Sequence, residues 1–201
     1  MMDGFKLHRA YLDRAAQAAM VKDIRECLTS APLFQPVMPR TGKSFSVRMS
    51  NAGPFGWVSD KAGGYRYQAR HPVTDTPWPP IPDSILSVWR ALADYDAEPE
   101  ACLINWYAPD AKMGLHRDTD EDDRDAPVLS ISLGDSAVFR IGPPEKGAKT
   151  ASVKLESGDV CLLTGPARES RHGIDRVLGG SSTLLNAPGR INVTLRRVSV
   201  P

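Results

Sequence analysis

The sequence predicts an α+β protein, mainly β, built around a β-sandwich or jelly roll, and two observations support this fold class. After residue 100 the chain becomes a series of short alternating runs separated by turn residues, a spacing typical of antiparallel sandwiches. Before residue 100 it carries two segments with helical periodicity, which we expect to cover one face of a sheet. A chain of 201 residues, 41% of them hydrophobic, is long enough to bury such a core.

The two helices are predicted over residues 12–28 and 83–95. Apolar residues recur at roughly helical spacing in the first segment and more clearly in the second. The second follows the proline-rich run TPWPPIP, so Asp83 or Ser84 is the expected N-cap. Its apolar stripe consists of Ile85, Val88, Trp89, Leu92 and Ala93.

The strands of the sandwich are predicted where apolar and polar residues alternate. Turn residues in APDAKMG, GPPEKG and ESGD separate these runs. Residues 40–70 are also predicted to form short strands, broken by glycines, which make a hairpin lobe over the main barrel. The six predicted strands after residue 100 are ACLINWY, VLSISLG, SAVFRIG, ASVKLES, DVCLLTG and RINVTLRR.

We expect residues 1–201 to form a single domain, with an N-terminal helical extension over 1–39 and a helix and jelly-roll core over 83–199.

No apolar run approaches the roughly 18 residues of a membrane span, and the first residues lack the pattern of a signal peptide. Cys27, Cys102 and Cys161 are widely spaced and odd in number, which gives no disulfide framework and no zinc knuckle. The expected compartment is therefore the reducing cytoplasm, with no membrane partner.

Charge is unevenly distributed, although the formal net charge is only +1. Residues 40–70 hold six Lys or Arg against one Asp, a local charge of +5. Residues 71–126 hold four Lys or Arg against thirteen Asp or Glu, a local charge of −9. The basic block suits a polyanion, and a solvated surface with clustered charges is the alternative.

The strongest chemical pattern is HRD, which contains His116 and Asp118, together with a later RHGI that contains His172. Residues two apart in an extended segment face the same side, so His116 and Asp118 can reach one metal ion. A jelly roll brings distant strands together and can add His172. Two histidines and one carboxylate form the ligand set of non-heme Fe(II) oxygenases. Surface or packing roles for these side chains are the alternative on the bare pattern.

The strand RINVTLRR presents a row of polar side chains on one face and apolar residues on the other. If that polar face lies inside a jelly roll, its cations need an anionic partner. A dicarboxylic acid such as 2-oxoglutarate fits, because an arginine fork binds a carboxylate through two hydrogen bonds. An edge strand with a wet polar face is the alternative. The row consists of Arg190, Asn192, Thr194 and Arg196, and Asn105 and Tyr107 share a face of INWY.

The chain resembles the AlkB family of Fe(II)- and 2-oxoglutarate-dependent dioxygenases, in particular its bacterial members that repair alkylated DNA. The similarity covers about residues 45–197 and is weaker upstream, through VRMSNAGPFGW and PWPPIP. The combination HxD…H…RxNxTxR is highly specific. The segments that carry the resemblance are NWYAPDAKMGLHRDTDE, APVLSISLG, VFRIG, SGD, GPARESRHGI and RINVTLR.

The resemblance implies a role for each matching residue. His116, Asp118 and His172 match the catalytic iron ligands. The 2-oxoglutarate contacts match Asn105, Tyr107, Arg190, Asn192 and Arg196, with Arg190 at the distal carboxylate and Arg196 near the iron-side carboxylate. Asp120 matches the contact to the exocyclic amine of the target base. Met49, Trp57 and Tyr65 match the base pocket under a nucleotide-recognition lid over 40–70, with Tyr67 as the alternative to Tyr65.

The implied fold is a double-stranded β-helix, which is a jelly roll, and the implied cofactors are Fe(II), 2-oxoglutarate and O2. The implied activity is oxidative demethylation of bases such as 1-methyladenine and 3-methylcytosine in DNA, preferentially single-stranded, or in RNA. It releases formaldehyde and converts 2-oxoglutarate to succinate and CO2. By analogy the protein is expected to be a monomer. The alternatives are a 2-oxoglutarate-dependent hydroxylase of a protein or small molecule, and a metal-binding jelly roll without oxidative activity.

The implied lid has a composition suited to nucleic acid. Its cations interleave with aromatic residues, and this combination lets cations contact phosphates while rings stack on bases. Ordinary core roles for Phe55 and Trp57 are the alternative reading of two of these aromatics. The aromatic residues of the segment are Phe45, Phe55, Trp57, Tyr65 and Tyr67.

Overall fold

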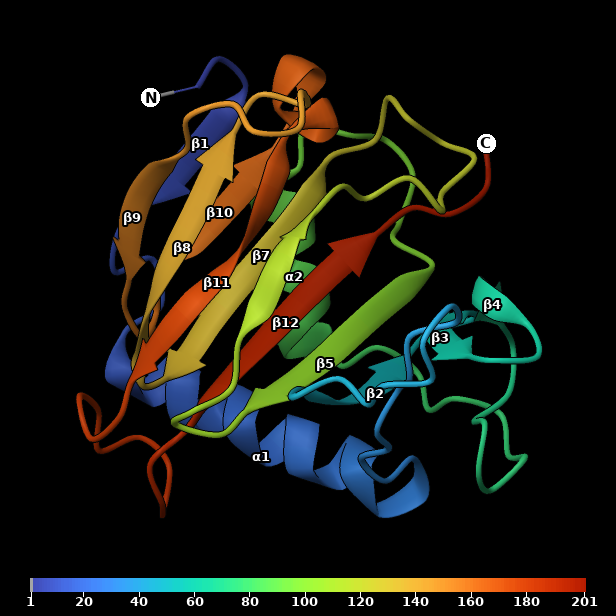
Figure 1. Ribbon diagram of the computed structural model, residues 1–201. Helices are drawn as coiled ribbons and strands as arrows, with labels where there is room; N and C mark the ends of the chain where they lie inside the picture. The colour runs from blue at the N-terminus through green and yellow to red at the C-terminus, as the bar shows by residue number, and fades with distance from the viewer. Residues whose placement is uncertain (1) are drawn as a thin grey trace.

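The computed structural model describes residues 2–201 and contains two antiparallel sheets packed face to face, as the sequence predicts (Figure 1). The six-stranded sheet has the order β1 (Phe5–His8), β10 (Val160–Leu163), β7 (Val128–Gly134), β12 (Arg190–Arg196), β5 (Ala101–Tyr107) and β2 (Arg48–Ala52). The four-stranded sheet has the order β6 (Met113–His116), β11 (Arg171–Leu178), β8 (Ser136–Gly142) and β9 (Ala151–Leu155). A short 3-10 helix, η1 (Gly165–Glu169), lies between β10 and β11.

Strands far apart in the sequence lie side by side in both sheets, which is the mark of a jelly roll. In the six-stranded sheet β12 pairs with β5 on one side and β7 on the other, with Asn192 opposite Asn105 and Ser132. In the smaller sheet β11 lies between β6 and β8. This topology makes β12 a central strand whose residues are all buried, so an edge strand with a wet face is excluded.

The two helices, α1 (Arg14–Ser30) and α2 (Asp83–Leu92), cover the outer face of the six-stranded sheet, as predicted (Figure 1). The carboxylate of Asp13 caps α1 by accepting a hydrogen bond from the Ala16 amide at 2.8 Å. The apolar side of β12 contributes to the same outer core. Members of this core from α2 and β12 include Ile85, Val88, Trp89, Ile191, Val193 and Leu195.

The predicted N-cap of α2 is wrong. Pro82 occupies the cap position, and no side chain caps the helix. The Ser84 hydroxyl instead donates to Asp23 of α1 at 2.6 Å, and Asp83 pairs with Arg90 within the helix. Proline at the cap leaves Asp83 in the first turn, where its negative charge still complements the helix dipole.

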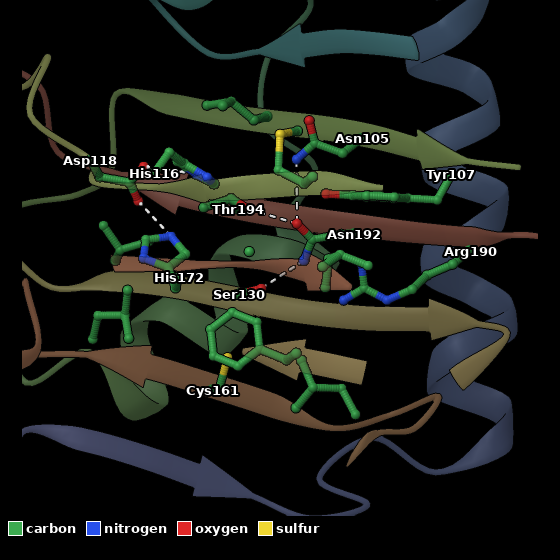
Figure 2. Close-up of a pocket in the computed structure, with 18 of the residues that line it drawn as sticks. Asn105, Tyr107, His116, Asp118, Ser130, Cys161, His172, Arg190, Asn192 and Thr194 are labelled. Carbon is green, nitrogen blue, oxygen red and sulfur yellow. Dashed lines mark hydrogen bonds and ion pairs between the residues drawn. The ribbon is translucent and has the colours of Figure 1, made fainter. Parts of the chain in front are cut away.

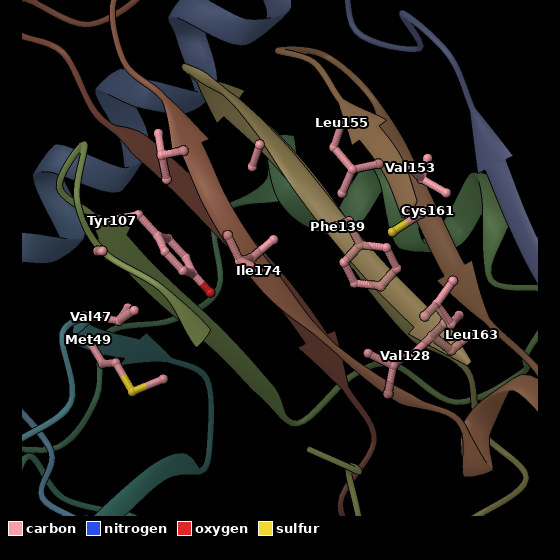
Figure 3. Close-up of a cluster of buried hydrophobic side chains, with 14 of the residues drawn as sticks. Val47, Met49, Tyr107, Val128, Phe139, Val153, Leu155, Cys161, Leu163 and Ile174 are labelled. Carbon is pink, nitrogen blue, oxygen red and sulfur yellow. The ribbon is translucent and has the colours of Figure 1, made fainter. Parts of the chain in front are cut away.

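The inner core lies between the sheets and is apolar at its β8–β9 side (Figure 3). Phe139 projects from β8 toward the six-stranded sheet, and its ring lies 5.8 Å from that of His172. The apolar side of the inner core therefore extends as far as His172, a candidate site residue. Other members of this cluster are Val128, Val153, Leu155, Cys161, Leu163 and Ile174.

Three strands are absent from the sequence prediction, namely β1, β6 and β11. Residues 40–70 divide between two places: β2 pairs with β5 and extends the main sheet, whereas β3 (Gly56–Asp60) and β4 (Gly64–Gln68) form a separate hairpin.

None of the helices within residues 2–201 has both the length and the apolar character that crossing a membrane requires.

Candidate active site

His116, Asp118 and His172 converge at one end of the space between the sheets (Figure 2). His116 ends β6 and is the direct cross-strand partner of His172 on β11. Asp118 follows two residues later, with its carboxylate oxygens 3.6 Å from His116 Nε2 and 3.5 Å from His172 Nε2. One ligand atom from each of the three side chains lies within 4.8 Å of the others, which is compact enough to surround one metal ion.

Backbone contacts orient both imidazole rings for metal binding. Nδ1 of His116 lies 2.9 Å from the Gly114 carbonyl oxygen, and Nδ1 of His172 lies 3.4 Å from that of Ser170. A carbonyl oxygen only accepts hydrogen bonds, so these contacts place the proton on Nδ1 and leave the lone pair on Nε2. Backbone carbonyls orient many metal-binding histidines in this way.

Asp118 is held in its anionic form. Its burial alone would raise the pKa of the carboxyl group, but the adjacent Arg196 and His172 hold that pKa well below its ordinary value. Burial and the neighbouring His172 lower the pKa of His116, which favours the neutral ring. An ionised carboxylate and a neutral imidazole are the protonation states that a metal ligand needs.

A cavity extends from this triad between the two sheets, and the polar face of β12 forms its floor (Figure 2). The expected row of side chains therefore points inward. From the triad end the row runs through Arg196, Thr194 and Asn192 to Arg190. Asn105 and Tyr107 of β5 line the cavity beside them.

Arg190 is a buried cation that has no acidic partner. Its residue surface is 1% exposed, and within residues 2–201 no carboxylate pairs with it. Its Nη2 donates to the Ser132 hydroxyl at 3.0 Å and its guanidinium lies 5.2 Å from the centre of the Tyr107 ring. Nε and Nη1 are buried without a hydrogen-bond partner. A buried guanidinium with unpartnered N–H groups fits the carboxylate of a bound acid.

Amide and hydroxyl groups fix the middle of the cavity. Asn192 donates to Ser130 Oγ at 2.6 Å and accepts hydrogen bonds from Thr194 Oγ1 and Asn105 Nδ2. The carbonyl oxygen of the Asn105 side chain is buried and has no partner. Sequence reasoning missed Ser130 and Ser132 as site residues, although their period-2 spacing in VLSISLG places both on the face toward the cavity.

Arg196 connects the triad to a second group of buried polar residues. Its Nη2 pairs with Asp118 at 2.8 Å, and its Nη1 contacts Glu121 at 2.7 Å and the Tyr67 hydroxyl at 3.1 Å. Its Nε is buried and unpartnered. Sequence reasoning missed Glu121 because it lies in an acidic run that is typical of a solvated loop. It also offered Tyr67 only as a base-pocket residue.

An outer pocket opens above the triad and is lined by Met49, Trp57, Tyr65 and Asp120. Trp57 stacks on Tyr65 with ring centres 5.6 Å apart, and its indole Nε1 donates to Asp120 at 2.7 Å. Tyr65, at 51% exposure, lines this pocket, whereas Tyr67 turns inward toward Glu121. The four residues predicted to bind the base therefore line one pocket beside the triad.

Comparison with known proteins agrees with this arrangement. The family model for the 2OG-Fe(II) oxygenase superfamily matches residues 4–196. An alpha-ketoglutarate-dependent dioxygenase AlkB homolog of Caulobacter vibrioides is 49% identical over 197 residues, which cover 98% of this chain and 89% of the relative. The alpha-ketoglutarate-dependent dioxygenase AlkB of Escherichia coli is 36% identical over 198 residues, which cover 96% of this chain and 90% of the relative.

A solved structure titled "The structure of OsALKBH1" superposes with a TM-score of 0.81 at 27% identity, covering 98% of each chain. Its agreement extends over both sheets, and the predicted jelly-roll core is thereby confirmed. The His-Asp-His cluster fits the metal of this enzyme class. The buried N–H groups of the cavity that have no hydrogen-bond partner fit its co-substrate. The chain belongs to the AlkB family of dioxygenases, which use Fe(II), 2-oxoglutarate and O2.

Proposed function

We propose that this dioxygenase removes methyl groups from ring nitrogens of nucleic-acid bases, with 1-methyladenine and 3-methylcytosine in DNA as its preferred class and RNA as a further substrate. Relatives that match about half of this chain include a "DNA N(6)-methyladenine demethylase ALKBH1D" of Arabidopsis thaliana, and a shorter match is a "tRNA demethylase abh1" of Schizosaccharomyces pombe. The observation that carries the proposal is the outer pocket, in which aromatic rings and the carboxylate of Asp120 lie directly beside the triad.

The triad holds the iron in this proposal. His116 and His172 offer Nε2, and Asp118 offers Oδ2, which is buried and has no hydrogen-bond partner. With 2-oxoglutarate and O2, a bound iron supplies oxidation of the N-methyl group to hydroxymethyl, which leaves as formaldehyde while 2-oxoglutarate becomes succinate and CO2. The protein holds both substrates in place and keeps water from the reacting carbon.

The cavity holds the co-substrate. Arg190 binds the carboxylate far from the iron through its unpartnered N–H groups, and Arg196 faces the iron-side carboxylate with its free Nε. Asn105, Tyr107 and Asn192 line the path between the two arginines. A dicarboxylic acid supplies the negative charge that Arg190 lacks inside the protein.

The outer pocket holds the target base. Methylation at N1 of adenine or N3 of cytosine leaves a positively charged ring, which suits stacking against Trp57 and a hydrogen bond from the exocyclic amine to Asp120. In the free protein the Trp57 indole already contacts this carboxylate and so keeps it at the pocket rim. Met49 and Tyr65 line the remaining sides.

The hairpin β3–β4 and the adjoining basic residues of 40–70 act as a lid over the catalytic core of residues 83–199 in this proposal. A base must leave its stack to reach the buried triad, and extrusion costs a few kcal/mol, least for a single strand. This cost supports a preference for single-stranded DNA. The cations of the segment suit phosphate contacts, and its exposed Tyr65 suits stacking on a neighbouring base. The protein acts as a monomer and one catalytic domain over residues 1–201.

Mass spectrometry of a 1-methyladenine oligonucleotide tests the proposal. The oligonucleotide is incubated with protein, Fe(II), ascorbate and 2-oxoglutarate, and we expect it to lose the mass of one CH2 group while formaldehyde and succinate form in equal amounts. An Asp118→Ala variant and an unmethylated oligonucleotide are the controls. A single-stranded and a double-stranded form of the same sequence are compared in parallel. Succinate formation that is indifferent to the methylated oligonucleotide, with no mass loss, would contradict the proposal.

A further inference from the structure

We propose that Glu121 is a positioning residue of the metal centre and that Tyr67 couples it to the β3–β4 hairpin. The inference rests on the metal role that the proposed function gives Asp118. It adds a physical connection between two parts of the molecule, so that the hairpin and the metal site stabilise each other through Arg196.

Glu121 lies at the centre of a closed polar network. Its side chain is 0% exposed, and its Oε1 accepts hydrogen bonds from the Tyr67 hydroxyl at 2.5 Å and from Arg196 Nη1 at 2.7 Å. Its Oε2 faces Arg168 Nη2 at 3.4 Å. A buried carboxylate with three donors from β4, β12 and η1 has a fixed position, because moving it would leave several buried polar groups unpaired.

This fixed carboxylate determines how Arg196 meets Asp118. Arg196 donates to Asp118 Oδ1 through Nη2, while Glu121 and Tyr67 hold its Nη1 and so fix the orientation of the guanidinium. In this orientation of the guanidinium, Asp118 Oδ2 is left without a hydrogen bond and is available to a metal. Without Glu121, the guanidinium is free to turn and bind both oxygens of Asp118 as a fork, the geometry that arginine and carboxylate prefer. That fork would occupy the atom that the metal requires.

The hairpin reaches the same loop at two points. Tyr67 of β4 donates to Glu121, and its direct cross-strand partner Trp57 of β3 donates to Asp120. A segment of only four residues thus connects the triad to the hairpin, through Asp118, Asp120 and Glu121. Because coupling between two sites is reciprocal, metal binding that fixes Asp118 must also stabilise the docked hairpin, and loss of docking must weaken metal binding.

Binding of Mn(II) alone to the metal-free protein tests the first half of the proposal. We expect Glu121→Gln to weaken Mn(II) affinity about tenfold and Tyr67→Phe about fivefold. The matched control is Tyr95→Phe, because Tyr95 makes the same kind of bond to Asp123, at 2.6 Å, on the same acidic loop but away from Arg196. The control is expected to bind Mn(II) as the wild type does. Free Mn(II) is measured by its electron paramagnetic resonance signal.

Hydrogen exchange of the hairpin amides tests the second half without any substrate. In the wild-type protein and in Tyr95→Phe, Mn(II) is expected to slow exchange across residues 56–68. In Tyr67→Phe, exchange is faster without metal, and the Mn(II)-induced slowing is lost. Tyr67→Phe removes one oxygen atom, so circular dichroism is expected to show a wild-type fold even if Glu121→Gln folds poorly.

Tyr67→Phe protein that binds Mn(II) as tightly as the wild type, and whose hairpin Mn(II) still protects, would overturn the coupling. That result would leave oligonucleotide demethylation by the wild-type enzyme untouched, so the failure of this inference is distinct from failure of the proposed function.

Discussion

Replacing Arg190 by Met separates ligand binding from stability, because this arginine is a buried cation that pairs with no acidic side chain among residues 2–201. Methionine has a similar length and retains apolar packing, but removes the charge and all five N–H donors. We expect Arg190→Met to bind 2-oxoglutarate far more weakly while the unliganded protein keeps or increases its free energy of unfolding. A residue that serves only the fold would show the opposite pattern.

The magnitudes follow from the contacts of Arg190. Its guanidinium has unpartnered N–H groups, and one edge of it can make two hydrogen bonds to a carboxylate, each worth about 1.5–3 kcal/mol. Their loss amounts to about 3–6 kcal/mol, or two to four orders of magnitude in affinity. In the unliganded protein the variant loses the bond to Ser132 and the contact with Tyr107, about 1–2 kcal/mol together. It also escapes the desolvation of an unpaired charge, a cost of several kcal/mol.

The assay combines calorimetric titration of the Mn(II)-loaded protein with 2-oxoglutarate and chemical unfolding of the metal-free protein. Arg168→Met is the matched control for stability, because Arg168 is also buried but bonds to the Ala126 carbonyl at 2.8 Å and faces Glu121. The control is expected to lose about 3 kcal/mol of unfolding free energy. Our reasoning is refuted if Arg190→Met unfolds as easily as Arg168→Met yet binds 2-oxoglutarate with wild-type affinity.

Three further predictions concern other parts of the molecule. Asp120→Ala is expected to lower kcat/KM for a 1-methyladenine oligonucleotide roughly tenfold to a hundredfold, while 2-oxoglutarate turnover without oligonucleotide persists. Equal loss of both activities would contradict the role of Asp120 at the base. Gly173→Ala would place a Cβ 2.8 Å from the carbonyl oxygen of Gly114, which orients His116. Mn(II) affinity should therefore fall about tenfold, and unchanged affinity would show that β6 can shift without disturbing His116. Burial raises the pKa of Glu100, but hydrogen bonds from Ser199 outweigh it and leave the pKa below 4.5. The stability that Glu100 provides is thus present above pH 4.5 and lost as the pH falls below it, so acid unfolding should be shallower in Glu100→Gln; identical curves would contradict this.

The parts of the fold that the sequence predicts well are those set by local periodicity. Strands β5, β7 and β8 occupy the predicted segments, because each is a short run rich in strand-forming residues that is bounded by turn residues. Strand β1, by contrast, has four residues and pairs with β10, more than 150 residues later, so its existence depends on a partner that no local window contains. Strand β6 begins inside a predicted turn and is fixed by pairing with β11.

The same distinction holds for the site. Spacing of two within a strand places His116 with Asp118, and Arg190 with Asn192, because alternation in a strand is a local rule. The position of Tyr67 is different, since Tyr65 and Tyr67 share one face of β4 and only the tertiary fold directs one to the outer pocket and the other to Glu121. A buried acid within an acidic run cannot be distinguished by pattern from its solvated neighbours. Only the approach of Arg196 marks Glu121 as part of the site.

A crystal structure of the protein grown anaerobically with Mn(II) and 2-oxoglutarate tests the central claim most directly. We predict one metal ion bound by Nε2 of His116, Nε2 of His172 and a carboxylate oxygen of Asp118. The far carboxylate of 2-oxoglutarate should lie on the guanidinium of Arg190. A metal bound elsewhere, or an acid whose far carboxylate leaves Arg190 unpaired, would contradict the account.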